Sequence, residues 1–275
     1  LATIMTIPLI TCAARLPVYI LLIGTFVPDS KIFGLFNAQA LSFFFLYFLG
    51  SFFALIIAKV FRLSFFRGKT NSFFMDLPHY QRPSIRLALI QAWSRGKIFL
   101  KKAGTIILAL SIVIWFASTY PTPDSSAVNN LSQKEISSYT LQNSYMGAVG
   151  KTIEPIIKPI GMDWKMGVGL LAAFGARELF VSTMGTIYAL GDVDEESNTL
   201  RQRLLNERDP ITNRPVYSLA TAWSLLIFFV FAMQCMSTLA VLKRETGSWA
   251  MPITATVYMG ALAYGGAFIA YKLLS

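Results

Sequence analysis

Three short stretches of the chain place reactive side chains inside apolar runs. They are "TCAARLPVY" (11–19), "GARELFVSTMGTIY" (175–188) and "FAMQCMSTLAVLKRETGSW" (231–249). If these runs cross a membrane, each charge within them costs at least about 2.5 kcal/mol on insertion scales, and charges at that depth usually mark a transport pathway. The three stretches are therefore the first candidates for a functional site.

The ligand types in these stretches favour a metal ion that accepts both oxygen and sulfur. We take Cys12, Glu178 and Cys235 as the candidate ligands, with Met184 and Ser182 as secondary ones. Thiols and thioethers suit soft or borderline metals, whereas carboxylates suit harder ones. Fe²⁺ lies between these classes, and Zn²⁺ and Mn²⁺ stay open on ligand type alone. The alternative for the sulfur groups is ordinary packing inside a helix bundle.

Two arginines are the expected charge partners of the candidate carboxylate. We expect Arg15 and Arg177 to keep Glu178 ionised when no metal is bound, and a metal would displace that pairing. The alternative is a purely structural ion pair between Glu178 and Arg15, although buried pairs often fail to offset their desolvation. The spacing also predicts that Cys12, Arg15 and Tyr19 share one helical face.

The composition is that of a membrane protein. Of 275 residues, 55% are hydrophobic and 14% are charged, against about 25% charged in soluble domains. A membrane-spanning helix needs about 20 apolar residues. Pro8 and Pro17 interrupt the first such run, and several glycines interrupt the fourth. Transporters tolerate such interruptions where the backbone lines a cavity. We expect an all-α polytopic bundle with broken helices, spanning at 2–27, 38–60, 100–119, 164–190, 218–242 and 248–271.

The distribution of basic residues predicts the orientation. Residues 59–102 carry ten Lys and Arg against the single acid Asp76, which places this loop in the cytoplasm. Within it, 84–102 alternates bulky apolar and basic groups and is typical of an amphipathic helix on the inner leaflet. Residues 120–163 then form an external loop. The net charge of +10 reflects this orientation and does not indicate a nucleic-acid partner.

The fourth span has two possible paths. If it crosses once, 191–215 is cytoplasmic and Lys243 and Arg244 lie outside. If it is a re-entrant hairpin, the acidic loop "GDVDEESN" lies outside and the two basic residues lie inside. The charge rule mildly favours the hairpin, but acidic residues count for little in that rule.

Soluble catalytic motifs are missing. "RLSFFRGKT" (62–70) ends like a phosphate-binding loop, but Leu63 occupies the position that needs the first glycine. The single histidine, His79, excludes multi-histidine metal sites and a Ser-His-Asp triad. Two cysteines indicate no disulfide framework. The run after Leu1 lacks the features of a signal peptide, and we expect a piece of a longer protein that is not itself an enzyme.

The sequence resembles the membrane domain of the FeoB family, the bacterial ferrous iron transport proteins B. The likeness rests on "IPLITCAARLPVY" (7–19), "GARELFVSTMGTIY" (175–188) and "QCMSTLAVLKRETGSW" (234–249), supported by "DLPHY" and "AWSRGKIFLKKAGTIIL", and it runs over nearly the whole chain. The resemblance implies an Fe²⁺ permease in the bacterial inner membrane. It implies that 1–60 and the basic segment 61–99 form the family's middle region, and that 100–275 forms the second gate repeat, which is nucleoside-transporter-like.

The resemblance also implies roles and partners. Cys12 and Cys235 match cysteines proposed as metal ligands, and Glu178 matches the gate-motif acid. A G domain that uses GTP and Mg²⁺, together with a first gate repeat, is expected upstream of Leu1. Membrane lipid and small Feo accessory proteins are further expected partners, and a homo-oligomer stays open. The family's eight crossings favour a single crossing for the fourth span and place Ser275 in the cytoplasm.

Two other functions stay open at this point. One is a gate-fold permease for a nucleoside or an organic anion, in which Arg15 and Arg177 would bind the solute. The other is a membrane scaffold that transports nothing and serves a soluble domain.

Overall fold

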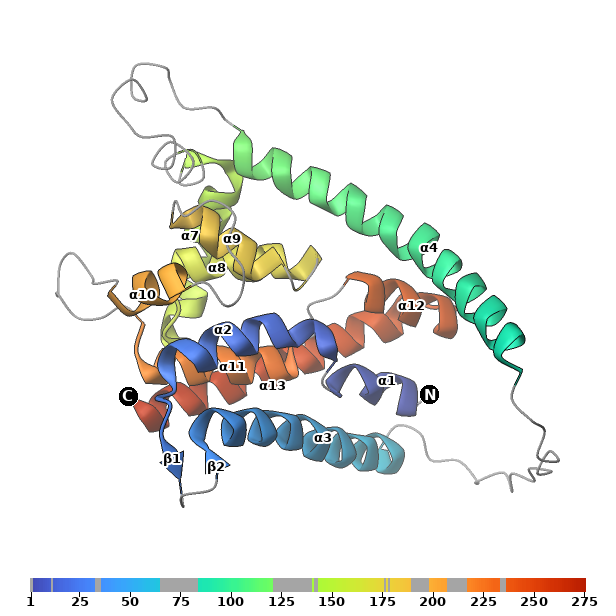
Figure 1. The fold of residues 1–275 in the computed structure, drawn as a ribbon, viewed down its shortest axis with the longest axis horizontal. Helices are drawn as coiled ribbons and strands as arrows, with labels where there is room; N and C mark the ends of the chain where they lie inside the picture. The colour runs from blue at the N-terminus through green and yellow to red at the C-terminus, as the bar shows by residue number, and fades with distance from the viewer. Residues whose placement is uncertain are drawn as a thin grey trace.

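The computed structural model describes the chain as a helix bundle in which a few long helices pack with shorter ones (Figure 1). The described residues are 2–10, 12–32, 36–64, 84–120, 140, 143–175, 177, 179–188, 198–206, 217–232 and 236–275. Among them the only strands are β1 (Lys31–Ile32) and β2 (Phe36–Asn37), which pair as a two-residue antiparallel ladder. The expected all-α class is confirmed.

Two helices are long and apolar enough to cross a membrane among the described residues. They are α3 (Ala38–Ser64) and α13 (Ala250–Leu274), which correspond to the second and sixth expected spans. Shorter apolar helices lie beside them: α2 (Leu16–Phe26) and α11 (Leu219–Phe231). The most extensive helix pairing is that of α11 with α13, and buried small residues of α13 face this contact, including Ala255, Ala263 and Ala267.

The first expected span is interrupted, as its prolines predict. It consists of α1 (Ala2–Thr6), the 3₁₀ turns η1 (Ile7–Leu9) and η2 (Ala13–Arg15), and then α2. Proline lacks an N–H and cannot continue the helical hydrogen-bond ladder. The expectation that Cys12 shares a helical face with Arg15 and Tyr19 is wrong, because Cys12 lies between the two turns, outside any helix.

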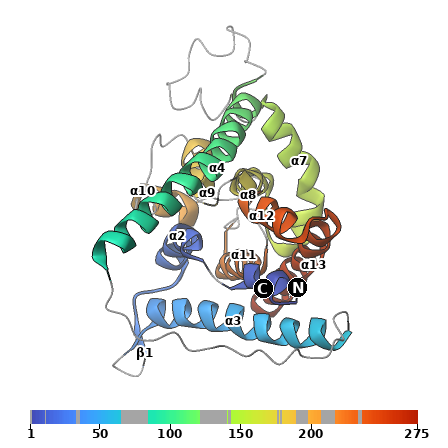
Figure 2. The same ribbon diagram turned by 90° about the vertical axis from the view of Figure 1, so that its right-hand side faces the viewer.

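The third expected span is the end of a longer helix. α4 (Ile85–Thr119) has 35 residues and is about 52 Å long at 1.5 Å per residue, more than the roughly 30 Å of a hydrocarbon core. It starts at Ser84, whose hydroxyl accepts from Leu87 N–H, and it continues through residue 100 without a break. α4 runs diagonally along one flank, and α7 (Tyr145–Ile157) descends along the opposite flank towards α13 (Figure 2).

The fourth expected span folds into a hairpin of α8 (Trp164–Gly175) and α9 (Leu179–Ile187). A Cβ added at Gly169 would meet the ring of Phe180 at 2.9 Å and the sulfur of Met184 at 3.3 Å. The ammonium of Lys165, near the start of α8, lies 4.9 Å from the ring centroid of Tyr188, just after α9. The two helices are therefore antiparallel with both ends at one edge, as in the hairpin alternative for the fourth span.

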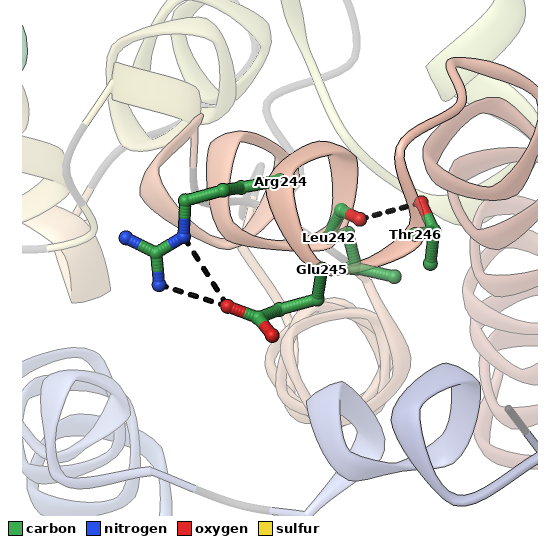
Figure 3. A network of polar contacts seen from close by, with 4 residues as sticks. All are labelled: Leu242, Arg244, Glu245 and Thr246. Atoms are coloured by element: carbon green, nitrogen blue, oxygen red, sulfur yellow. Dashed lines mark hydrogen bonds and ion pairs between the residues drawn. The ribbon is translucent and has the colours of Figure 1, made fainter.

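The fifth expected span is divided at Ala232. α11 ends at Phe231, and α12 (Met236–Thr246) completes the path. The last turn of α12 carries an exposed ion pair between Arg244 and Glu245 at 2.9 Å, beside a Thr246 hydroxyl that donates to the Leu242 carbonyl (Figure 3). Such exposed pairs contribute little to stability, so we interpret this end as a polar boundary of the bundle.

Two contacts of α13 define the opposite edges of the bundle. Near its start, Tyr258 donates to the Met5 carbonyl and packs edge-on against Phe61, close to the end of α3. Near its end, the ring of Tyr271 lies against Gly161, which adopts a left-handed φ of 78°. Ser275 therefore lies at the edge opposite the end of α3, where the basic loop begins. This does not fit the expectation that Ser275 shares the cytoplasmic side with that loop.

α10 (Asn198–Asn206) closes the edge near the end of α2. Its Leu200 and Leu204 are buried, and the guanidinium of Arg201 lies so close to Gly24 that a Cβ there would meet it at 2.8 Å. Within residues 189–216, the structure describes this short helix. The phosphate-loop-like residues 65–70, His79, and residues 121–139 of the expected external loop lie outside the described residues.

Candidate metal path at three helix breaks

Each of the three reactive stretches coincides with a point where an α-helix stops inside the bundle. We call these points helix breaks: the first lies between α1 and α2, the second at the tip of the α8–α9 hairpin, and the third between α11 and α12. A helix end leaves backbone groups without intrahelical partners. Breaks at membrane depth are tolerated where protein or a wet cavity faces them, so three of them in one bundle indicate a built polar region.

Arg15 closes the first break. Its side chain is fully buried, and its guanidinium donates to the carbonyls of Pro8 at 3.1 Å and Leu9 at 3.4 Å. These carbonyls belong to the 3₁₀ turn before the break, where the helical ladder has stopped. Because Arg15 folds back onto its own chain, it stabilises the irregular backbone around Cys12, and it does not snorkel to the membrane surface.

Arg177 joins the second break to the third. It lies at the hairpin tip, just before α9, with 5% of its surface exposed, and its guanidinium donates to the Ala232 carbonyl at 3.1 Å. Ala232 follows the last residue of α11, so its carbonyl is one of the acceptors that the helix end leaves available. This bond docks the hairpin tip onto the interrupted α11–α12 path.

The buried Tyr19 links the first break to the other two. The charges of both Arg15 and Arg177 act on its hydroxyl, and α2, which carries Tyr19, contacts both α9 and α11. The ring of Tyr19 packs edge-on against Phe43 and Tyr47 of α3, with centroids 6.4 Å apart in each pair. Three distant stretches of sequence therefore meet around two buried guanidinium groups.

The candidate ligands are only partly placed. Cys12 is a free thiol and is exposed at the first break. Met184 is 1% exposed, and its sulfur packs towards Gly169 inside the hairpin, whereas Ser182 is exposed on another side of α9. Glu178 and Cys235 lie outside the described residues. They are the sequence neighbours of Arg177 and of the first residue of α12, at the second and third breaks.

The described polar groups at the breaks are mainly guanidinium cations and backbone carbonyls. Within the described ranges, no group of three or more His, Cys, Asp or Glu side chains could hold a metal ion. Two buried guanidinium groups favour an ionised carboxylate nearby, and Glu178 is the adjacent acid in the sequence. An apolar cavity of about 260 Å³ between α7, α8, α11 and α13 reaches Ala232, with Gly167, Phe174 and Phe228 among its lining residues.

A second polar cluster, which the sequence analysis missed, lies at the base of the hairpin. The Asp163 carboxylate accepts from the Tyr217 hydroxyl at 3.1 and 3.0 Å and from Met166 N–H at 3.0 Å, and Tyr188 donates to the Tyr217 hydroxyl at 2.9 Å. The bond to Met166 makes Asp163 the N-cap of α8. The N-cap role of Asp163 could have been predicted from the sequence, because Asp before an apolar helix is a common start signal.

Burial governs the protonation of this cluster. Desolvation raises the pKa of the Asp163 carboxyl above its ordinary value of 3.8, although the bonds from Met166 and Tyr217 and the charge of Lys165 act in the opposite direction. Desolvation, together with the nearby Asp163 charge, also raises the pKa of Tyr217 well above 10.0. Tyr217 therefore stays protonated at physiological pH and continues to donate to Asp163.

Comparison with known proteins shows that the chain is similar to proteins named as iron transporters. Residues 100–249 match the family model Gate, described as nucleoside recognition, and residues 43–95 match the model for the ferrous iron transport protein B C terminus. The Fe(2+) transporter FeoB of Leptospira interrogans is 45% identical over 99% of this chain. The FeoB of Campylobacter jejuni and an FeoA–FeoB fusion protein of Porphyromonas gingivalis are each 35% identical over 98%.

The chain spans about two fifths of the length of these relatives: 39% of the Leptospira protein, 41% of the Campylobacter protein and 34% of the Porphyromonas fusion. No solved structure matches the chain. The family-model matches nevertheless cover the second and third helix breaks and the segment around the basic loop, and the match to the Leptospira relative covers nearly the whole chain. The chain therefore belongs to the FeoB family of ferrous iron transport proteins.

Proposed function

We propose that this chain carries part of the Fe²⁺ path through the bacterial inner membrane, and that the path passes the meeting point of the three helix breaks. The observation that carries the proposal is the bond from Arg177 to the Ala232 carbonyl, which brings the hairpin tip to the α11–α12 break. Family membership supports the cargo, because the similar proteins are named Fe(2+) transporters.

The proposed ligands are Cys12, Glu178 and Cys235, one from each break. A carboxylate and two sulfur groups form a mixed donor set that Fe²⁺ accepts. The exposure of Cys12 supports its access to an ion. Ser182 and Met184 remain secondary, and the packing of Met184 inside the hairpin makes it the weaker of the two.

Arg15 and Arg177 hold Glu178 ionised when no iron is bound. Their burial supports this role, because a guanidinium in a low-dielectric region strongly favours a nearby carboxylate in its charged form. An arriving Fe²⁺ replaces the guanidinium charge beside the carboxylate. Arg177 can then strengthen its bonds to backbone carbonyls such as that of Ala232, so that the same groups serve the empty and the loaded states.

The rest of the transporter supplies the regulation in this proposal. A G domain that binds GTP and Mg²⁺ and a first gate repeat would lie in the part of the relatives that this chain does not cover. The Porphyromonas relative is named as a fusion of Fe(2+) transport protein A with FeoB, which supports a small accessory protein as a partner. A homo-oligomer stays open.

We further propose that the edge with the basic loop and the end of α12 faces the cytoplasm. Lys243 lies 4.0 Å over the ring of Trp249 at that edge, a pairing typical of the membrane interface, where Trp and basic residues gather. The α8–α9 hairpin and Ser275 then belong to the outer edge. This orientation agrees with the charge distribution that favoured a hairpin.

Uptake of radioactive Fe²⁺ by a bacterium that lacks its own transporter tests the function, with this chain carried in the full-length protein. We expect Glu178→Gln to abolish most uptake and Cys12→Ser and Cys235→Ser to reduce it. Glu245→Gln, an exposed carboxylate on α12, is the matched control and keeps the parental rate. A Glu178→Gln protein that moves Fe²⁺ at the parental rate, or competition of uptake by nucleosides, contradicts the proposal.

A further inference from the structure

The α8–α9 hairpin is attached to the α11 segment at both of its ends. At the tip, Arg177 donates to Ala232, just after α11; at the base, Asp163 accepts from Tyr217, two residues before α11 begins. α8 has 12 residues and α11 has 13, so both are about 18–20 Å long at 1.5 Å per residue. Between these two attachments, the ring of Phe180 in α9 packs edge-on against Phe229 of α11, with centroids 5.2 Å apart, so we call the hairpin docked when these contacts are made.

The base attachment contains a carboxyl group, that of Asp163, which can take up a proton. Tyr217 is 3% exposed, and its hydroxyl lies within hydrogen-bond distance of both Asp163 oxygens and of the Tyr188 hydroxyl. Among the described residues, the groups that act on Asp163 are Lys165 from α8, Tyr217 before α11 and, through Tyr217, Tyr188 after α9. We call Asp163, Tyr188 and Tyr217 the hairpin clasp.

We propose that Asp163 and Tyr217 are positioning residues for transport: they hold the base of the hairpin on α11, and one proton on the Asp163 carboxyl decides how tightly. This proposal rests on the proposed function, because a hairpin that undocks moves its tip, and with it Arg177, away from the α11–α12 break. The site of proton binding is separated from the hairpin tip by the length of α8, about 18 Å, so it acts through the position of the hairpin.

Thermodynamic linkage gives the direction in which pH shifts the docking of the hairpin. Burial in the docked state raises the pKa of the Asp163 carboxyl, and a group with a higher pKa in one state stabilises that state when it is protonated. Protonated Asp163 therefore favours the docked hairpin. Loss of the proton leaves a desolvated carboxylate that regains water when the base separates from α11, so rising pH favours release.

Two variants separate the proton from the attachment. Asp163→Asn keeps an N-cap residue and a neutral acceptor for Tyr217, and it mimics the protonated carboxyl at every pH. Tyr217→Phe keeps the buried ring but removes the hydroxyl that joins Asp163 to Tyr188. Tyr264→Phe is the matched control, because Tyr264 of α13 donates to the Ile156 carbonyl at 2.9 Å and has no bond to the hairpin.

Hydrogen–deuterium exchange of the peptides within 164–188, corrected for intrinsic exchange rates, tests the clasp without iron. In the full-length parent and in Tyr264→Phe, we expect protection to fall severalfold across a series of rising pH. Asp163→Asn should be protected at every pH, and Tyr217→Phe should exchange rapidly at every pH. Parental exchange in both clasp variants would overturn the proposal.

Anaerobic Fe²⁺ uptake over the same pH range tests the link to transport. Asp163→Asn should lower the maximal rate severalfold and remove its pH dependence without changing the Fe²⁺ concentration for half-maximal uptake, since the ligands are untouched. A change in exchange with a parental pH profile of uptake would overturn the positioning role. If the parent and Tyr264→Phe take up no iron while the exchange results hold, the proposed function fails and the clasp stands.

Discussion

The guanidinium of Arg177 and the carbonyl of Ala232 lie 3.1 Å apart, although 55 positions of sequence separate the residues. One belongs to the tip of the α8–α9 hairpin and the other to the end of an interrupted helix. The bond serves two purposes: it provides a partner for a buried cation and an acceptor that the end of α11 leaves open. The charge of Arg177 in an apolar run therefore has a structural role, the attachment of the hairpin, in addition to its proposed role in the ion path.

Removing this bond should impair transport more than the same substitution at an exposed arginine does. Hydrogen bonds to charged groups contribute about 1.5–3 kcal/mol, so Arg177→Gln should reduce the rate of Fe²⁺ uptake by about tenfold or more. Arg177→Lys should recover part of it, because the ammonium keeps the charge but lacks the planar fork. Arg244→Gln, at the exposed end of α12, serves as the control. Equal uptake by the Gln variants of both arginines would contradict the role of Arg177.

The contact between the two hairpin helices depends on the small size of Gly169. An added methyl group would lie 2.9 Å from the ring of Phe180 and 3.3 Å from the sulfur of Met184. Overpacking of this kind costs about 1–3 kcal/mol, so Gly169→Ala should lower the midpoint of thermal unfolding in detergent. Gly260→Ala in α13 meets nothing within 4 Å, and alanine is the better helix former by roughly 0.5–1 kcal/mol. We expect that control to hold or raise the midpoint.

The hairpin determines which side of the membrane each segment faces. Tyr145 precedes the hairpin and Leu205 follows it, and both are exposed. In a background without the native cysteines, Tyr145→Cys and Leu205→Cys should react with a membrane-impermeant thiol reagent from the outside of intact cells. Ser248→Cys, beyond α12, should react only after the cells are opened. Labelling of Ser248→Cys in intact cells, with Leu205→Cys reactive only after the cells are opened, would instead indicate a single crossing by residues 164–188.

The raised pKa of Asp163 predicts how stability depends on pH. The folded state holds this proton more tightly than the unfolded chain, whose carboxyl has its ordinary pKa of 3.8. The resulting stabilisation is complete below 3.8 and is lost as the pH rises through the pKa of the folded state. The difference in unfolding midpoint, Asp163→Asn minus parent, should therefore increase as the pH rises. A difference independent of pH would show that burial does not affect this carboxyl.

Much of the fold could be predicted from local sequence. Apolar runs long enough for a bilayer predicted α3 and α13, and Pro8 and Pro17 predicted an interruption before α2. Local helical spacing failed at Cys12, because two 3₁₀ turns replace the helix there. The division of α11 from α12 was also missed, since neither proline nor glycine marks "AMQC".

By itself, the sequence determined that this is a helical membrane protein of the FeoB family and that three apolar stretches carry reactive groups. Only the tertiary structure decided that residues 164–188 turn back, because the lengths of one crossing and of two half-crossings are nearly the same. It also decided which polar groups meet. Asp163 and Tyr217 are 54 positions apart and Arg177 and Ala232 are 55 apart, and no local periodicity relates such partners. Burial of helix ends against one another joins them, since each orphaned carbonyl or carboxylate needs a donor from elsewhere in the bundle.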